Sequence, residues 1–278
     1  MKAIIQIPCL NEQETLPATL ADLPREIDGI DEIEFLVIDD GSTDETVAVA
    51  LECGVDHIVK LPNNRGLAAG FQAGLDACLK LGADIIVNTD ADNQYSGADV
   101  PLLVRPILDG EAEMVVGDRD VAAIAHFSAP KKVHQKIGSW VVRRLSDTEI
   151  TDATSGFRAY SREAALQLLV VDNFTYTLES LIQAGKGNVA VGEVAIRTNA
   201  KTRDSRLFGS TSAYVRRNGL AILRIYTRYE PLKVFSGLGV LVGVLALAAW
   251  MPFLVDWILN GDRDGHIQSL LLGAVLFI

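Results

Sequence analysis

The sequence contains few cysteines and histidines, which narrows the classes of protein it can encode. Of its 278 residues, 3 are cysteine and 4 are histidine. Cys9, Cys53 and Cys78 form no CxxC pair and no zinc-binding spacing, which fits a reducing compartment and disfavours a disulfide scaffold. The N-terminus, MKAIIQIP, has too short an apolar run for a secretory signal, so we expect the N-terminal region to stay in the cytosol.

Two nucleotide-binding motifs are also missing. The chain has neither GxGxxG nor GxxxxGK followed by Ser or Thr, which disfavours a dinucleotide-binding fold and a P-loop. His57, His126 and His134 match no catalytic motif, so obvious general bases are scarce. Phosphate charge bound by this chain would therefore have to be balanced by a metal and by arginines.

Basic residues are rare in the first 125 positions. This part holds 7 Lys and Arg against 24 Asp and Glu, whereas residues 126–231 hold 16 against 9. The contrast predicts a site whose metal-binding and anion-binding sides come from different segments. The alternative is that most of these carboxylates only keep the surface soluble.

Short apolar runs alternate with helical segments, which is typical of an α/β fold with a mainly parallel sheet. Asn11, with Glu14 three positions later, is the predicted N-cap of the first helix, and Ser42 or Thr43 that of the second. We predict strands at 3–8, 33–38, 57–60, 85–89, 115–119 and 189–197, and helices at 11–23, 45–53, 67–81 and 172–183.

Three of these strands deliver polar residues to one edge of the sheet, at 8–12, 39–40 and 90–94. Ligands of open α/β sheets bind outside the carboxyl ends of the strands. Asp90 and Asp92 lie one residue apart after a buried strand, so both can face one hard cation such as Mg²⁺ or Mn²⁺ beside a substrate phosphate. The alternative is an acidic turn that only solubilises the strand end.

The C-terminal region has the composition of a membrane segment. Residues Val234 to Val255 carry no charge, and Trp250 and Trp257 lie near one end, as interfacial anchors do. A second apolar run begins at Ile267, and a helix stopping at 278 would be too short to span, so we expect the natural chain to continue. A buried core helix of a soluble protein is the alternative.

The predicted domains are therefore a cytosolic catalytic domain, 1–231, and a transmembrane region, 232–278, with one helix at about 233–258 and another from 267. Basic residues precede the first apolar run, which by the positive-inside rule places residues 1–231 on the cytoplasmic face of a multi-pass membrane protein. These residues are Arg216, Arg217, Arg224, Arg228 and Lys233. Amphipathic helices near 131–144 and 210–230 could rest on anionic lipid, although a solvated basic face at 131–144 is an equal alternative.

Four ordered motifs carry a resemblance to a known family. They are PCLNE at 8–12, VIDDGSTD at 37–44, NRG at 64–66 and DADNQ at 90–94. Together they resemble family 2 glycosyltransferases of the GT-A fold, most closely the dolichyl-phosphate mannose synthase group and its bacterial polyprenyl-phosphate relatives. The resemblance covers about residues 3–230 and extends to the membrane helices.

The resemblance implies a nucleotide-sugar site with a divalent metal, Mg²⁺ or Mn²⁺. It implies that Asp90, Asp92 and Gln94 bind the metal, and that Arg119 contacts the donor. For Arg119, a surface ion pair with Asp118 or Asp120 is the alternative. The remaining donor-binding residues that it implies are Pro8, Leu10, Asn11, Glu12, Ile38, Asp39, Asp40, Ala91, Arg203 and Arg206.

A second set of residues is implied for the acceptor and the reaction. Asp152 and Arg158 lie in a segment similar to the family's D-x-x-S-G-F-R, and Arg143, Arg144 or Arg158 could meet an acceptor phosphate. Asp92, Arg119, Asp152 and Arg203 are the predicted catalytic residues. Glu179 is either a supporting partner or plain surface. The family often has Pro or Gly at the position of Asp204 and Lys at Gly209, so the chemistry of that loop is expected to differ here.

The sequence thus predicts an inverting transfer of sugar from a UDP- or GDP-linked donor to a polyprenyl or dolichyl phosphate. An anionic lipid phosphate can attack without a general base. One alternative is transfer to a glycan or glycolipid hydroxyl with Asp152 as base, and another is a non-catalytic nucleotide-sugar-binding scaffold. Membrane lipids are expected partners, self-association could occur through the transmembrane helices, and no nucleic acid is expected.

Overall fold

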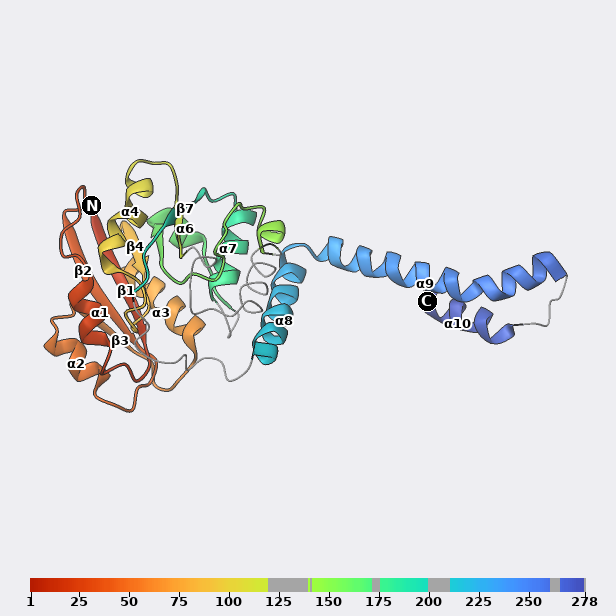
Figure 1. The fold of residues 1–278 in the computed structure, drawn as a ribbon, viewed down its shortest axis with the longest axis horizontal. Helices are drawn as coiled ribbons and strands as arrows, with labels where there is room; N and C mark the ends of the chain where they lie inside the picture. Colours follow the sequence, from red (N-terminus) through yellow and green to blue (C-terminus); the bar gives the residue numbers. More distant parts are fainter. Residues whose placement is uncertain (120–139, 141, 172–175, 200–210, 261–265, 278) are drawn as a thin grey trace. The chain divides into compact units, whose positions relative to one another are not determined.

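A seven-stranded sheet organises the first part of the chain (Figure 1). The computed structural model describes residues 1–119, 140, 142–171, 176–199, 211–260 and 266–277. The strands stand in the order β3-β2-β1-β4-β6-β5-β7. All neighbouring pairs are parallel except β4–β6 and β5–β6, so the predicted α/β fold with a mainly parallel sheet is confirmed. The strands are β1 Lys2–Cys9, β2 Glu32–Asp39, β3 His57–Lys60, β4 Ile85–Asn88, β5 Met114–Asp118, β6 Arg158–Ser161 and β7 Val191–Ala195.

Helices pack on both faces of this sheet. Because side chains alternate along a strand, Ile4 of β1 packs with Phe71 and Leu181 on one face, and Ile5 packs with Leu16 on the other. Each such buried side chain contributes roughly 1.5–3 kcal/mol. The helices of this part are α1 Leu16–Asp22, α2 Thr46–Glu52, α3 Leu67–Lys80, α4 Val100–Leu108, α6 Arg162–Gln167 and α7 Tyr176–Lys186, with the 3-10 helix η1 Gly97–Asp99.

The predicted caps of the first two helices are wrong. Helix α1 has Thr15 at its N-cap, and Asn11 lies four residues earlier with a left-handed φ of 56°. Helix α2 begins at Thr46, whose main-chain N–H donates to Asp44 Oδ1 at 3.0 Å, so neither Ser42 nor Thr43 caps it. The side chains expected to cap helices instead join the two loops that follow β1 and β2.

Strand β6 was not predicted. It is four residues long and fully buried, and it lies between β4 and β5 in the antiparallel direction. Because it reverses direction between them, β5 runs the same way as β4. The carboxyl ends of β1, β2, β4 and β5 therefore all lie at one edge of the sheet, as the sequence predicted for the first three.

Residues Tyr226–Ile278 form a second compact unit. It contains α9 Pro231–Asn260 and α10 Ile267–Phe277, and α8 Thr211–Tyr229 precedes them. Trp250 Nε1 of α9 donates to the carbonyl of Leu270 on α10 at 3.0 Å, so the two helices pack side by side.

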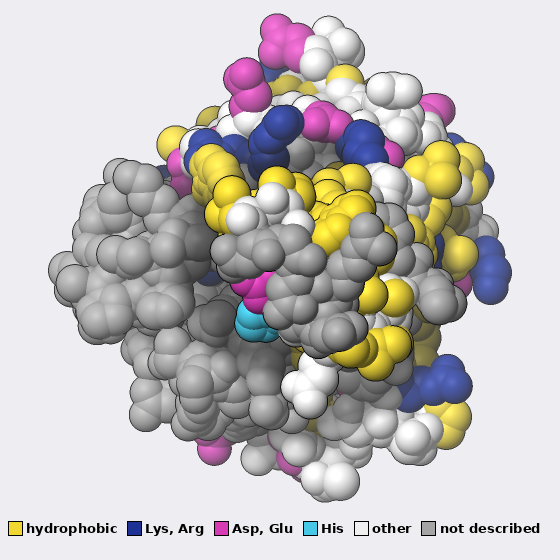
Figure 2. All heavy atoms as spheres, turned by 90° about the vertical axis from the view of Figure 1, so that its right-hand side faces the viewer, with side chains coloured by type: hydrophobic (Ala, Val, Ile, Leu, Met, Phe, Trp, Pro, Cys, Tyr) yellow, Lys and Arg dark blue, Asp and Glu magenta, His cyan; other side chains and the backbone are white. Residues whose placement is uncertain are grey.

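The surface of α9 is strongly apolar. Leu232 and Ile258, near its two ends, are 83% and 73% exposed. Figure 2 looks at the right-hand side of the view in Figure 1, and hydrophobic side chains are prominent among the described residues on that face. Within the described residues, one helix, Pro231–Leu259, is long and apolar enough to cross a membrane, with a mean hydropathy of 2.4. Helix α10 has 11 residues, so the predicted second crossing is not confirmed.

Candidate active site

The loops after β1 and β2 are tied together by polar side chains. Asp39, only 2% exposed, accepts the main-chain N–H of Ser42 at 2.9 Å. The Ser42 hydroxyl accepts the N–H of Asn11 at 2.9 Å, and Asn11 Oδ1 accepts the N–H of Thr43 at 2.8 Å. Glu12 donates its N–H to Thr46 Oγ1. Asn11, Glu12 and Asp39 thus shape this edge, where Pro8, Leu10 and Ile38 also lie.

Asp40 fixes a third loop against these two. Its Oδ1 accepts the N–H of Arg65 at 2.7 Å and its Oδ2 the N–H of Gly66 at 2.9 Å. This third loop packs closely against Gly41, where an added Cβ would lie 2.8 Å from the backbone of Asn63. In this structure Asp40 therefore orders the entrance to α3, and its contact with a nucleotide stays a prediction.

The loop after β4 presents oxygen atoms suited to a divalent cation. Asp92 Oδ2 accepts from Gln94 Nε2 at 2.8 Å and Oδ1 from the Gln94 N–H at 3.2 Å, which leaves Gln94 Oε1 as an acceptor. The carbonyl of buried Ala91 accepts the Thr19 hydroxyl at 2.9 Å and anchors the loop to α1. Asp90 and Asp92 are both partly exposed.

The oxygen atoms of this loop can hold Mg²⁺ or Mn²⁺ only if water or a bound molecule completes the coordination shell. Asp90, Asp92 and Gln94 offer hard oxygen atoms, which both ions prefer. Across the described ranges no group of three or more His, Cys, Asp or Glu residues could hold a metal. A cation here would therefore complete its shell with water and with phosphate oxygens of a bound molecule.

Gly156 lies directly against the Asp90 carboxylate. Its N–H donates to the Tyr95 hydroxyl at 3.0 Å and its carbonyl accepts from Asn88 Nδ2 at 2.9 Å. A Cβ at this position would be 2.6 Å from the Tyr176 hydroxyl and 3.2 Å from an Asp90 oxygen. Only glycine fits between Tyr176 and Asp90 without displacing one of them.

We expect Gly156→Ala to destabilise the fold by about 1–3 kcal/mol, the usual cost of overpacking. It should also weaken metal-dependent nucleotide binding, because the carboxylate of Asp90 must move. Gly219→Ala on α8, where an added Cβ meets nothing within 4 Å, is the matched control. Chemical denaturation and calorimetric titration would measure both effects. Equal stability of the two variants would contradict the crowding at Gly156.

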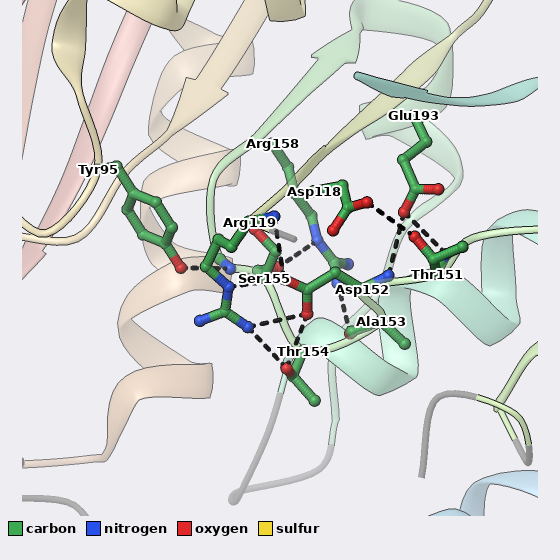
Figure 3. A network of polar contacts seen from close by, with 11 residues as sticks. Tyr95, Asp118, Arg119, Thr151, Asp152, Ala153, Thr154, Ser155, Arg158 and Glu193 are labelled. Carbon is green, nitrogen blue, oxygen red and sulfur yellow. Dashed lines mark hydrogen bonds and ion pairs between the residues drawn. The ribbon is translucent and has the colours of Figure 1, made fainter. Parts of the chain in front are cut away.

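Arg119, just beyond the end of β5, is held by Asp152 (Figure 3). Its Nε and Nη2 donate to the two Asp152 oxygens at 2.6 and 2.8 Å, and Nη2 also donates to Thr154 Oγ1 at 2.8 Å. The alternative prediction was a surface ion pair with Asp118 or Asp120; the structure pairs Arg119 with Asp152, and Asp120 lies outside the described residues. The Arg119 side chain remains 18% exposed.

The ion pair with Arg119 determines the protonation state of Asp152. Burial favours a raised pKa for this carboxyl, but the hydrogen bonds and charge of Arg119 outweigh burial and lower its pKa below the usual value. Nearby, burial raises the pKa of Tyr95 to about 12. Asp152 therefore stays ionised with both oxygens bound, which fits a clamp for Arg119 better than a general base.

Arg158 does not have the surroundings expected of a residue that contacts an acceptor phosphate. Its side chain is fully buried at the start of β6. Nε donates to the Ser155 carbonyl, Nη2 to the Ala153 carbonyl, and Nη1 to the Thr177 carbonyl, each at 2.8 Å. With its donors bound to main-chain acceptors, Arg158 does not fit the predicted contact with an acceptor phosphate, and we assign it a structural role.

The other predicted residues divide into three groups. Glu179 is fully buried and accepts the N–H of Val171 at 3.0 Å, so it is not plain surface. Arg143 is half-buried and Arg144 is exposed, within a helical run at 142–146. Arg203, Arg206, Asp204, Gly209 and most of the predicted helix 131–144 lie outside the described residues.

Sequence reasoning missed the residues that support the site. Tyr95, Asn88, Tyr176 and Glu193 were not singled out. Tyr95 directly follows the DADNQ motif, which was the one available signal. The others are brought in by packing: Asn88 Nδ2 donates to the Tyr176 hydroxyl at 2.9 Å, and Gln6 Nε2 donates to Asn88 Oδ1 at 2.9 Å.

Comparison with known proteins agrees with this architecture. A solved structure of glucosyl-3-phosphoglycerate synthase from Mycobacterium tuberculosis, in complex with Mn²⁺, uridine diphosphate and phosphoglyceric acid, superimposes with a TM-score of 0.62. It is 22% identical and covers 81% of this chain and 78% of that chain. The first part of the chain therefore has the GT-A fold.

Sequence comparison identifies the family to which this chain belongs. The model of glycosyl transferase family 2 matches residues 4–169, and the chain belongs to this family. UDP-N-acetylglucosamine–dolichyl-phosphate N-acetylglucosaminyltransferase of Methanococcus voltae is 29% identical over 69% of this chain and 83% of its own. Undecaprenyl-phosphate mannosyltransferase of Micrococcus luteus is 27% identical over 86% of this chain and 100% of its own. The protein is thus a glycosyltransferase.

Proposed function

We propose that this glycosyltransferase moves a sugar from a UDP- or GDP-linked donor to a polyprenyl phosphate at a membrane. The observation that carries the proposal is the presence, in one chain, of an oxygen-lined GT-A site and a helix long enough to cross a bilayer. The two relatives are named for transfer to dolichyl phosphate and to undecaprenyl phosphate, which supports the same class of acceptor.

In this proposal the donor binds at the carboxyl edge of β1, β2 and β4. Asp90, Asp92 and Gln94 would hold a divalent cation, which would neutralise charge on the leaving diphosphate. Arg119 binds the diphosphate through its guanidinium, which suits phosphate oxygens. Arg203 and Arg206 are proposed to add to that charge compensation, and Arg143 or Arg144 to meet the acceptor phosphate.

The hydrogen bonds of the Asp152 carboxylate bear on whether the acceptor is a lipid phosphate or a sugar hydroxyl. A polyprenyl phosphate is anionic near neutral pH, so its oxygen can attack the sugar without a base. The alternative acceptor, a sugar hydroxyl, would need one, and the predicted base Asp152 has both oxygens engaged by Arg119. The lipid phosphate therefore has better support than the hydroxyl.

Membrane association is proposed through α9. The basic residues that precede it favour the cytoplasmic face for the catalytic part under the positive-inside rule. A second crossing would need more apolar length than the 11 residues of α10 provide. Self-association through these helices is proposed as a property to test by cross-linking in detergent.

The proposal is tested by transfer of labelled sugar. We expect label from a UDP- or GDP-sugar to enter the lipid extract only when polyprenyl phosphate and Mg²⁺ or Mn²⁺ are present. Thermal stabilisation by UDP and by GDP, each with and without Mn²⁺, would identify the donor class beforehand. Transfer to a glycan hydroxyl without polyprenyl phosphate would instead support the alternative acceptor.

A further inference from the structure

Glu193 binds the turn that carries Asp152. It lies half-buried on β7, where it pairs in register with Val116 of β5. Its Oε1 accepts two consecutive main-chain N–H groups, from Thr151 at 2.8 Å and from Asp152 at 3.0 Å (Figure 3). One carboxylate oxygen on a strand of the sheet therefore fixes the position of both residues.

The turn needs such support because residues 151–157 form no helix or strand. A third hydrogen bond reaches it from β5, where Asp118 Oδ2 accepts the Thr151 hydroxyl at 3.0 Å. The two acceptors, Asp118 and Glu193, come from neighbouring parallel strands. Hydrogen bonds to a charged acceptor are about twice as strong as neutral ones, so the turn is held firmly against the sheet.

The position of the turn sets the orientation of Arg119. Asp152 holds the guanidinium through two parallel hydrogen bonds, a geometry that fixes a plane as well as a distance. Among the residues that the structure describes, Nη1 of Arg119 makes no hydrogen bond, so it remains able to donate to an anion. A guanidinium fixed before binding loses less rotational freedom when the anion arrives.

We propose that Glu193 is a positioning residue for nucleotide binding, acting through the turn at Thr151 and Asp152 to hold Arg119 ready for the diphosphate. The chain of contacts runs from β7 through the turn to the arginine. This inference rests on the part of the proposed function that assigns Arg119 to the donor. It does not depend on the identity of the acceptor.

The test is a double-mutant cycle on nucleotide affinity in the full chain, purified in detergent. Calorimetry would give the Kd of UDP and of GDP with Mn²⁺ for Glu193→Ala, Arg119→Ala and the double variant. We expect Glu193→Ala alone to raise the Kd about tenfold, equivalent to about 1.4 kcal/mol. In the Arg119→Ala background the same change should have less than about a twofold effect, because coupled residues are not additive.

Two further variants separate positioning from stability. Glu193→Gln keeps an oxygen acceptor and should restore most of the affinity, whereas Glu193→Met keeps the bulk but not the acceptor and should behave as Glu193→Ala. Glu113→Ala is the matched control, since Glu113 is also half-buried and accepts one main-chain N–H, from Ala190 at 3.0 Å, away from the turn. It should leave the Kd unchanged.

An equal loss of affinity from Glu193→Ala with and without Arg119 would overturn the inference, as would unchanged affinity in Glu193→Ala and Glu193→Met. Failure of the wild-type chain to bind either nucleotide would overturn the assignment of Arg119 and this inference with it. A chain that binds nucleotide and shows the coupling, yet transfers no sugar to polyprenyl phosphate, would refute only the proposed acceptor.

Discussion

Substitution of Asp92 by asparagine is expected to lower the rate of sugar transfer at least about 100-fold, since changing groups that merely support a metal ligand already costs 10–100-fold. The neutral amide keeps the shape of the side chain but loses the charge that attracts a divalent cation. The amide oxygen of the introduced asparagine can still accept the Gln94 N–H, so the fold should be retained. Initial rates at saturating Mn²⁺, with the melting temperature as a check, would measure this.

Asp76→Asn is the matched control for this experiment. Asp76 accepts from Gln72 Nε2 at 2.8 Å, the same type of contact and the same distance as the bond from Gln94 Nε2 to Asp92. It lies exposed on α3, away from the loop after β4. Transfer rates that fall equally in both variants, or that survive in Asp92→Asn, would remove Asp92 from the proposed metal site.

Arg158→Met is expected to destabilise the protein by at least about 3 kcal/mol, because each buried acceptor left without a donor costs about 1–3 kcal/mol. Methionine keeps an unbranched apolar side chain but leaves the carbonyls of Ala153 and Ser155 without the donors that Arg158 supplies, and it removes one of the donors to the Thr177 carbonyl. The effect should appear as a lower denaturant midpoint, whether or not any ligand is present.

The same variant separates the two interpretations of Arg158. If the arginine met an acceptor phosphate, Arg158→Met would keep the stability of the wild type and raise only the KM for polyprenyl phosphate. Arg105→Met provides the comparison, because Arg105 is 60% exposed and its pair with Asp109 lies on the surface. Such exposed pairs contribute about 0.2–1 kcal/mol.

Most of the fold was predictable from local pattern. The apolar runs at Ile4, Phe35 and Ile86 became buried strands because β-branched and aromatic residues in short runs suit a sheet covered on both faces. Strand β6 was not predictable in the same way. Its four residues include Arg158, and only the contacts of that arginine with the surrounding carbonyls make burial favourable.

The candidate site was likewise predictable in part: residues that follow neighbouring strands were predicted, whereas contacts between distant segments were not. The sequence placed Asp39, Asp90 and Asp92 at one edge, because parallel strands deliver their carboxyl ends together. It did not foresee that Asp40 would bind the loop before α3, or that Arg119 would pair with Asp152, 33 residues further along the chain. Partners so distant in sequence leave no local periodicity or spacing by which to find them.

The sequence by itself therefore determined the α/β class, the acidic edge and the apolar C-terminal segment, because each depends on residues that are neighbours along the chain. Only the tertiary structure decided which charged groups are free to meet a ligand and which are used to hold the fold. Arg158 and Arg119 are the same residue type, yet Arg158 is enclosed by carbonyls, whereas Arg119 is clamped by a carboxylate and keeps 18% of its side chain exposed. That difference arises from burial and from partners supplied by other elements.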